Sequence, residues 1–206
     1  MYIPEPFAQD DHALLIEVMR AANFAMLISA GPDGEPFVTH LPVIIRDGDG
    51  SLTIEGHMAR ANPHWQYLEK AARALIVFSG PHAYVSPSLY ASKENVPTWN
   101  YVAVHAYGPI KLRHEMGDKH VAQERLIGEL EPGYKQQFDE LRPVYLHGRM
   151  SAIVAFEMAV ERMEGKFKLS QNRPMVDRHT IANAFADGSD QQRAVASWMR
   201  RVSLKE

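Results

Sequence analysis

Short β-strand patterns separated by tight turns constrain the fold of this chain more than any other feature. Gly31–Gly34 and Asp47–Gly50 are turn sequences built from Gly, Pro and Asp, and apolar or β-branched segments flank both of them. The predicted strands cover residues 24–30, 36–45, 51–57, 73–79 with a continuation at 83–86, 99–108 and 151–163. The long alternation of strands and helices that a doubly wound sheet needs is missing. The pattern therefore predicts a mainly β (α+β) fold, a small antiparallel barrel with peripheral helices.

Helical patterns precede the barrel and accompany its last strands. Asp10 or Asp11 can cap the first helix. The other predicted helices cover residues 114–130, part of 133–141, 175–186 and 190–202. Pro42 lies inside the second predicted strand and indicates a bulge or an edge position, because proline has no N–H for the ladder. We expect residues 1–174 to form the barrel domain and residues 175–206 to form a C-terminal helical extension packed on it.

The composition excludes several classes of site. The 206 residues include no cysteine, which excludes disulfides, cysteine-ligated zinc, iron–sulfur clusters and cysteine nucleophiles. The formal net charge is −3, so no overall basic field would draw the chain onto nucleic acid or an anionic membrane. No apolar stretch approaches the roughly 20 residues that cross a bilayer, and the N-terminal sequence lacks a signal-peptide pattern. We therefore expect a cytoplasmic protein that does not enter a membrane.

The segment Gly56–Trp65, where a predicted strand leads into a short helix, is a candidate anion-binding site. Asn62 can cap that helix with Pro63 at its first position, and the start of the helix offers free backbone N–H groups. Arg60 adds a fork of donors and His57 adds a donor that protonation can switch, which together suit a phosphate. The alternative is an ordinary capped turn with a surface arginine.

The strand predicted at 99–108 has two chemically different faces. Val102, Val104 and Ala106 share one face, as core residues do. The ring-bearing residues of the other face are Trp99, Tyr101, His105 and Tyr107. These rings could stack on a planar cofactor or pack a subunit interface. The alternative is a single cross-strand aromatic cluster.

A second anion-binding candidate is the segment Gly165–Pro174. In an extended chain, Lys166, Lys168 and Ser170 lie on one face, and Arg173 precedes a predicted helix start. The alternative is a solvated basic turn.

Other chemistries have weaker support in the sequence. The nucleophile elbow of α/β-hydrolases, the dinucleotide fingerprint and the Walker loop are all missing. Four histidines could ligate a metal or haem iron in principle, but no short metal-binding spacing occurs, so we expect no metal site; they are His57, His64, His82 and His105. The two closing helices could form a helix-turn-helix that contacts DNA through cations of the second helix, namely Arg193, Arg200, Arg201 and Lys205.

Several of these segments together resemble the PaiB-like family of FMN-binding negative transcriptional regulators. The resembling segments are Met1–Pro4, Gly56–Pro63, Gly80–Pro87, Val96–Gly108 and Glu164–Pro174, and the resemblance runs from residue 1 to about residue 187. It implies an antiparallel split β-barrel similar to that of pyridoxamine-phosphate oxidases and flavin reductases. It also implies FMN as the cofactor, a homodimer with FMN at the subunit interface, and a role in gene repression.

The strand order of related barrels then implies roles for individual residues. The residues that would line the flavin ring are Thr39 and His40. Those that would meet the phosphate or ribityl chain are His57, Arg60 and Asn62. Those that would close the site from the partner subunit are Trp99, Asn100 and Tyr101. The residues that would complete the polar shell are Lys166, Lys168, Ser170 and Gln171.

Three functions are compatible with these features. The first is a regulator whose FMN site senses flavin or redox state, and the second is an FMN-dependent oxidoreductase. The third is a split barrel that binds haem through one of its histidines. The sequence contains no evident acid–base pair for the position of the flavin ring, so no catalytic residue is predicted, and FMN itself can carry the redox chemistry.

Overall fold

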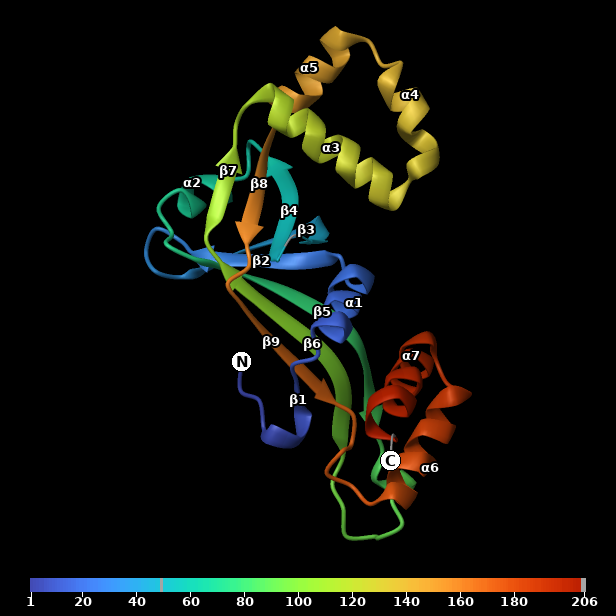
Figure 1. Cartoon of the computed structure of the whole chain (residues 1–206). Helices are drawn as coiled ribbons and strands as arrows, with labels where there is room; N and C mark the ends of the chain where they lie inside the picture. Colours follow the sequence, from blue (N-terminus) through green and yellow to red (C-terminus); the bar gives the residue numbers. More distant parts are fainter. Residues whose placement is uncertain (49, 205–206) are drawn as a thin grey trace. The chain divides into compact units, whose positions relative to one another are not determined.

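The computed structural model describes residues 1–48 and 50–204, and these form two compact units (Figure 1). The first unit contains Met1–Ala21, Ser79–Val104 and the described residues from Glu164 onward. The second unit contains the described residues of Ala22–Phe78 and of His105–Met163. Strands β5 (Ala74–Val85), β6 (Thr98–Gly108) and β9 (Arg162–Lys168) contribute residues to both units. The predicted mainly β, antiparallel architecture with peripheral helices is confirmed.

The strands of the second unit follow in the order β5-β2-β3-β4-β8-β7. The strands not yet bounded are β2 (Phe24–Ala30), β3 (Pro36–Gly48), β4 (Ser51–Ala59), β7 (Ile110–Arg113) and β8 (Ile153–Ala159). Strand β3 pairs with β2 as far as Pro42 and with β4 from Val43 onward, so Pro42 stands where the strand changes partner. At the far end of β3, Gly48 pairs with Ser51, and Asp49 of the predicted turn lies outside the described residues.

The core of the second unit follows the alternation of its strands. Ile54 and Met58 of β4 and Met158 of β8 are almost fully buried. Gly56, which lies between them, is required by close packing, because a Cβ atom there would lie 2.8 Å from Cζ of Phe156. This contact explains why a glycine opens the sequence that leads to Arg60.

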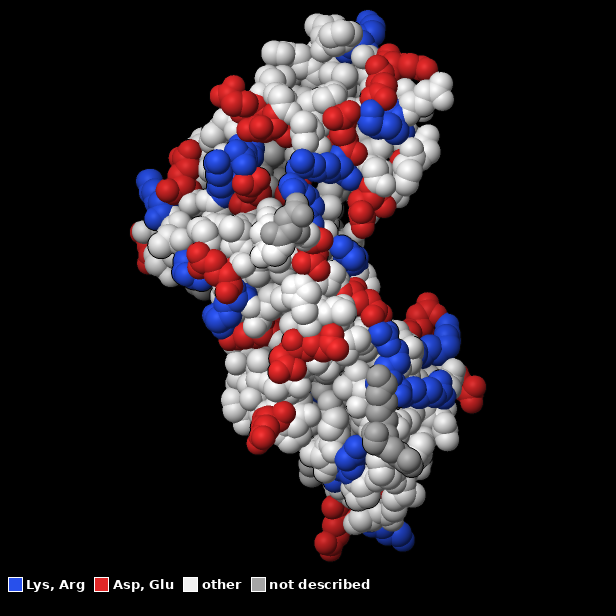
Figure 2. Space-filling view, viewed as in Figure 1, with Lys and Arg blue, Asp and Glu red and all other residues white. Residues whose placement is uncertain are grey.

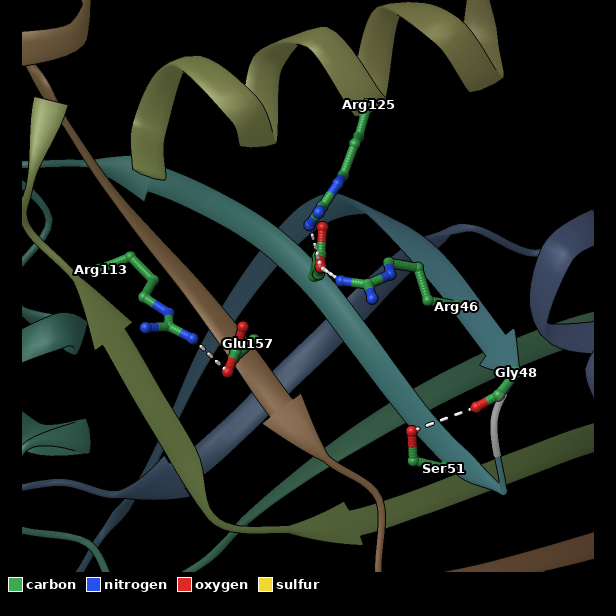
Figure 3. Close-up of polar contacts among 7 residues, drawn as sticks. Arg46, Gly48, Ser51, Arg113, Arg125 and Glu157 are labelled. Atoms are coloured by element: carbon green, nitrogen blue, oxygen red, sulfur yellow. Dashed lines mark hydrogen bonds and ion pairs between the residues drawn. The ribbon is translucent and has the colours of Figure 1, made fainter. Parts of the chain in front are cut away.

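The helices of the second unit include a group inserted between β7 and β8 (Figure 1). The unit's helices are α2 (His64–Leu68), α3 (Met116–Leu130), α4 (Lys135–Asp139) and α5 (Pro143–Ser151), with a 3-10 turn at Pro132–Tyr134. Helix α3 is fastened to the sheet by Arg125, whose Nη1 donates to Oε1 of the buried Glu55 at 2.6 Å (Figure 3). Arg46 of β3 binds the same carboxylate oxygen.

The strands of the first unit follow in the order β1-β9-β6-β5. Its other elements are β1 (Ala8–Gln9), α1 (His12–Ala21), α6 (Met175–Ala186), α7 (Asp190–Trp198), 3-10 turns at Glu5–Phe7 and Pro87–Leu89, and a π-helical turn at Met199–Ser203. Asp11 caps α1 by accepting the Leu14 N–H at 3.1 Å. The Trp198 ring meets Phe167 of β9 edge-on at 5.1 Å, so the closing helices share the core of this unit.

One predicted strand was wrong in its bounds. Residues 151–163 do not form a single strand, because α5 extends through Ser151, β8 ends at Ala159 and β9 begins at Arg162. The backbone N–H groups of Val160 and Glu161, which lie between the two strands, donate to the carbonyls of Leu52 and Tyr107 and so continue the registers in which β8 pairs with β4 and β7. The boundary expected at residue 174 stays a prediction. Within residues 1–48 and 50–204, no helix combines the length and apolar character that a bilayer span requires.

Candidate functional site

A polar corner forms in the second unit where β4 ends and α2 begins. We call residues 60–64, together with Thr39 and Ser29, the Arg60 corner. Asn62 holds the turn, since its Oδ1 accepts the His64 N–H at 3.0 Å and its Nδ2 donates to Thr39 Oγ1 at 3.0 Å. Asn62 therefore binds the start of the helix as predicted, but the helix begins at His64 with Pro63 as its N-cap, one residue later than predicted. The same turn brings Thr39 and Asn62 into direct contact.

His64 is the buried centre of the Arg60 corner. Its side chain is fully buried, its Nε2 lies 3.0 Å from Ser29 Oγ, and its Nδ1 lies 2.7 Å from Thr39 Oγ1. Burial lowers the pKa of His64 to about 4, so the ring is neutral near pH 7. The sequence singled out His64 only as a metal or haem ligand, whereas both ring nitrogens are hydrogen-bonded to hydroxyl groups.

The hydrogen bonds of the corner run in one direction. In the His64 tautomer that carries its hydrogen on Nε2, Ser29 accepts from the ring and donates to the Ala30 carbonyl. His64 Nδ1 is then an acceptor for the Thr39 hydroxyl, which itself accepts from the Asn62 amide. A neutral His64 therefore fixes the orientation of Thr39 and Asn62, because a protonated ring would present two donors.

Arg60 is held by its backbone and by one side-chain nitrogen. Its N–H donates to the Ala152 carbonyl at 2.8 Å, its Nε donates to the Ser151 carbonyl at 2.9 Å, and its carbonyl accepts from Trp65 Nε1 at 2.9 Å. The guanidinium carbon lies 6.0 Å from the Trp65 ring centroid. Among the described residues no carboxylate pairs with Arg60, so its two terminal nitrogens are available to an anion.

The other two predicted residues of this unit lie apart from the hydroxyl network. His40 follows Thr39 on β3 and therefore points to the opposite face, where it is exposed and stacks on Phe24 at 6.2 Å. His57 is half-buried beside Gln123 of α3, and burial lowers its pKa. His57 lines a cavity of about 580 Å³ whose other walls are mostly apolar side chains of α3, α4 and α5.

The first unit holds Trp99, Asn100 and Tyr101 of β6, whose side chains alternate between the two faces of the strand. The other two ring-bearing residues of the predicted face, His105 and Tyr107, belong to the second unit. Trp99 is 50% exposed, and its ring lies 5.5 Å from His82 and 6.1 Å from Tyr84. Asn100 faces the other way and is fully buried, where its Oδ1 accepts from Ser170 Oγ at 3.0 Å. Its Nδ2 meets the sulfur of Met199 at 3.5 Å, so Asn100 ties β6 to the closing helices.

The predicted lysines of the first unit bind backbone and ring groups of the same unit. Lys166 donates to the Tyr2 carbonyl at 3.0 Å, and its ammonium lies 5.4 Å from the Tyr101 ring centroid. Lys168 donates to Thr98 Oγ1 at 2.6 Å and to the Trp99 carbonyl. Burial, together with the nearby charges of Lys166 and Arg173, lowers the pKa of Lys168.

Ser170 and Gln171 shape the turn that follows β9. Ser170 has φ = 66°, a left-handed conformation that few residues other than glycine and asparagine adopt. The Gln171 side chain accepts the Leu169 N–H at 2.7 Å and donates to the Phe167 carbonyl. Both side chains are therefore engaged within their own unit, and the twelve predicted residues fall into two groups, five in the second unit and seven in the first.

Comparisons with known proteins agree with this architecture. A family described as "Putative FMN-binding domain" matches residues 1–162. "Protease synthase and sporulation protein PAI 2" of Bacillus subtilis (strain 168) is 37% identical over 182 residues, covering 86% of this chain and 85% of that protein. An uncharacterized protein of Emericella nidulans is 27% identical over 249 residues, covering 100% of this chain and 99% of that protein.

Two solved structures show the same fold at low identity. The flavocytochrome Anf3 of Azotobacter vinelandii superposes with a TM-score of 0.62 at 21% identity, covering 78% of this chain and 69% of that chain. The FAD and haem binding protein of Mycobacterium smegmatis superposes with a TM-score of 0.60 at 16% identity, covering 78% and 73%. The predicted split-barrel fold is confirmed.

Proposed function

This chain belongs to the family of FMN-binding domains that matches its residues 1–162, FMN is its cofactor, and we propose that it is a regulatory protein that responds to the flavin or to its redox state. The Arg60 corner would hold the FMN phosphate. The observation that carries this placement is a fixed guanidinium whose terminal nitrogens lack a carboxylate partner among the described residues.

The donors of the corner fit a phosphate ester. The Ser151 carbonyl aligns the Arg60 guanidinium through Nε and leaves the two terminal groups for phosphate oxygens. Asn62 adds an amide, since only one of its two N–H groups is used by Thr39. When bound, FMN supplies hydride and single-electron transfer.

Arg60→Ala tests the phosphate placement. Loss of a charge-assisted hydrogen-bonded partner costs about 1.5–3 kcal/mol, which raises the Kd for FMN about 10- to 150-fold. Arg142→Ala is the matched control, because Arg142 is an exposed arginine of the same unit. Flavin fluorescence quenching gives both affinities, and an unchanged Kd for Arg60→Ala contradicts the placement.

The proposed regulatory role rests on one observation. The Bacillus subtilis relative is named as a sporulation protein. In a strain that carries Arg60→Ala, transcript levels should change in the same direction as in a strain that lacks the gene for this protein. If the Arg60→Ala protein no longer binds FMN but the transcript levels of its strain equal those of the wild-type strain, flavin-dependent regulation is refuted. Sustained NAD(P)H oxidation by the FMN-loaded protein favours the oxidoreductase instead.

DNA contact by the closing helices remains a prediction. Arg201 forms a bidentate ion pair with Glu17 at 2.6 and 2.7 Å, and Arg193 pairs with Asp190, so two cations of the second helix already have acidic partners. Lys205 lies outside the described residues. On the face seen in Figure 2, acidic and basic side chains are interspersed, so this face offers no broad basic surface to DNA.

A homodimer is part of the proposal. Trp99 and Tyr84 are 50% and 49% exposed and pack against each other on one surface of the first unit, and exposed aromatic patches commonly mark contacts between proteins. Trp99→Ser should weaken the dimer in sedimentation velocity experiments, whereas Val96→Ser, which alters an exposed loop residue of the same unit, should not. A wild-type protein that sediments as a monomer at micromolar concentration refutes this part.

A further inference from the structure

We propose that the cavity of the second unit, which lies between helices α3, α4 and α5 and the ends of strands β4 and β8, binds a second small molecule, an uncharged aromatic compound that carries a hydroxyl group. The inference goes beyond the proposed function. The residues of the Arg60 corner do not line this cavity, so FMN and the second ligand can be bound at the same time.

The cavity has the size and the walls of a small-molecule site. Its volume is about 580 Å³, and ligand pockets usually measure about 300–1,000 Å³. Most of its walls are apolar, and three of the side chains carry rings, namely Tyr134, Phe138 and Tyr145. Phe138 and Met150 are almost fully buried, so the helices hold this wall in place. Because rings gain stability from offset or edge-to-face contacts with one another, these walls favour an aromatic ligand.

The charges around the cavity favour an uncharged ligand. Its charged lining residues are Glu131 and Arg149, which have opposite signs and are both exposed, so that water solvates them. Burial lowers the pKa of the half-buried His57, so the ring is neutral near pH 7. An ionic ligand would therefore lose hydration among the apolar side chains without gaining a buried partner of opposite charge.

The polar pair His57 and Gln123 specifies the hydroxyl group. Gln123 Nε2 lies 3.2 Å from Nδ1 and 3.3 Å from Nε2 of His57, and a neutral ring has one nitrogen that accepts and one that donates. Within residues 1–48 and 50–204, no group accepts from the N–H of this ring and none donates to the Gln123 carbonyl. One hydroxyl group can do both, since it accepts from His57 and donates to Gln123 Oε1.

This assignment gives His57 a ligand other than the FMN phosphate or ribityl chain that the family resemblance implied. His57 points to the cavity together with Gln123 of α3, a helix that belongs to the group inserted between β7 and β8 (Figure 1). The inserted helices thus have a function of their own, which is to enclose a second ligand on the outside of the sheet.

Isothermal titration calorimetry of the FMN-loaded protein with 2-naphthol tests the site. The comparison compounds are 2-methoxynaphthalene, which has the same rings but no O–H, and 2-naphthoate, which is an anion. We expect 2-naphthol to bind with a Kd below about 1 mM and about 3- to 10-fold more tightly than 2-methoxynaphthalene, the effect of one hydrogen bond. The anion 2-naphthoate should bind at least about tenfold more weakly than 2-naphthol.

Three variants locate the binding. Gln123→Leu removes the acceptor of the hydroxyl group, so it should weaken 2-naphthol to the affinity of 2-methoxynaphthalene and change the latter less than about twofold. Ile127→Trp fills the cavity and should weaken both compounds about tenfold or more. Gln137→Leu is the matched control, because Gln137 is an exposed glutamine of α4 that does not line the cavity. Gln123→Leu adds no volume and decides the question if Ile127→Trp does not fold.

Several results would overturn the proposal. Heats without saturation up to about 1 mM 2-naphthol, equal affinities for 2-naphthol and 2-methoxynaphthalene, or tighter binding of 2-naphthoate would each contradict it. Unchanged 2-naphthol binding by both Gln123→Leu and Ile127→Trp would mean that the compound binds elsewhere. Release of FMN by 2-naphthol, seen as a rise in flavin fluorescence, would show that the cavity is not separate from the flavin site. None of these results depends on the phosphate placement, which Arg60→Ala tests by itself.

Discussion

Replacing His64 tests the hydrogen-bond relay of the Arg60 corner through its pH dependence. His64→Gln is the informative change, because a glutamine amide can donate to Ser29 and accept from Thr39 without titrating near neutral pH. The wild-type side chain is fully buried, and this burial lowers its pKa to about 4 because it disfavours the charged ring.

The sign and size of the effect follow from the two pKa values. In the unfolded chain His64 binds a proton as the pH falls through 6.5, whereas in the folded protein it stays neutral until about pH 4. Protons therefore favour the unfolded state across this window, and the free energy of unfolding falls with decreasing pH. The full loss is about 3 kcal/mol below pH 4, and about 2 kcal/mol of it has occurred at pH 5.

Urea denaturation followed by circular dichroism at pH 7.5, 6.5, 5.5 and 5.0 measures this loss. Because other groups titrate too, the quantity of interest is the unfolding free energy of wild type minus that of His64→Gln at each pH. This difference should shift by about 2 kcal/mol in favour of the variant between pH 7.5 and 5.0. The lowered pKa of His57 contributes equally to both proteins and cancels.

His40→Gln is the matched control, since His40 is an exposed histidine of the same unit. Its difference from wild type should stay constant within about 0.5 kcal/mol over the same range, as for most surface substitutions. If the difference between wild type and His64→Gln also stays constant over this pH range, His64 has the same pKa in the folded and the unfolded protein. That result refutes the neutral-ring relay.

Three further substitutions address packing and capping, with free energies of unfolding from urea denaturation as the measurement. Gly56→Ala should destabilise by about 1–3 kcal/mol, because the added Cβ overlaps the Phe156 ring; a neutral result would mean that the ring moves freely. Arg125→Met should destabilise by about 1–2 kcal/mol, since Glu55 stays buried with one arginine fewer, and an increase in stability would contradict this tether. Ser189→Ala should lose about 1 kcal/mol with the capping box of α7, and no loss would show that the cap is not formed in solution.

Local signals in the sequence predicted much of the secondary structure. Strand β2 and helix α6 have the predicted bounds, because the turn at Gly31–Gly34 follows the strand, and Pro174 and the turn at residues 187–189 stand at the two ends of the helix. The alternation along β6 also separated the buried Val102 and Val104 from the ring-bearing face. The pairing of Asn62 with the start of α2 was equally a local matter, spanning only two residues.

Contacts between distant segments were beyond any local pattern. The sequence suggested Asn100 as a cofactor contact beside Trp99, yet period-two geometry turns it into the core, where its partners lie 70 and 99 residues away. His64 gained its neutral state from hydroxyls on β2 and β3, which only the sheet brings to the start of α2. The N–H groups of Val160 and Glu161, between β8 and β9, likewise find their acceptors only in the distant residues Leu52 and Tyr107.

The sequence by itself determined the antiparallel strands, the turns and the Arg60 segment, because turn chemistry and side-chain alternation act over a few neighbouring residues. Only the tertiary structure decided which charges lie buried and what partners they have. The sequence alone indicates no more for Lys119 than a polar residue of an amphipathic helix. Its burial arises from the packing of α3 on β4, which is held by the ion pair of Arg125 with Glu55, two residues 70 positions apart.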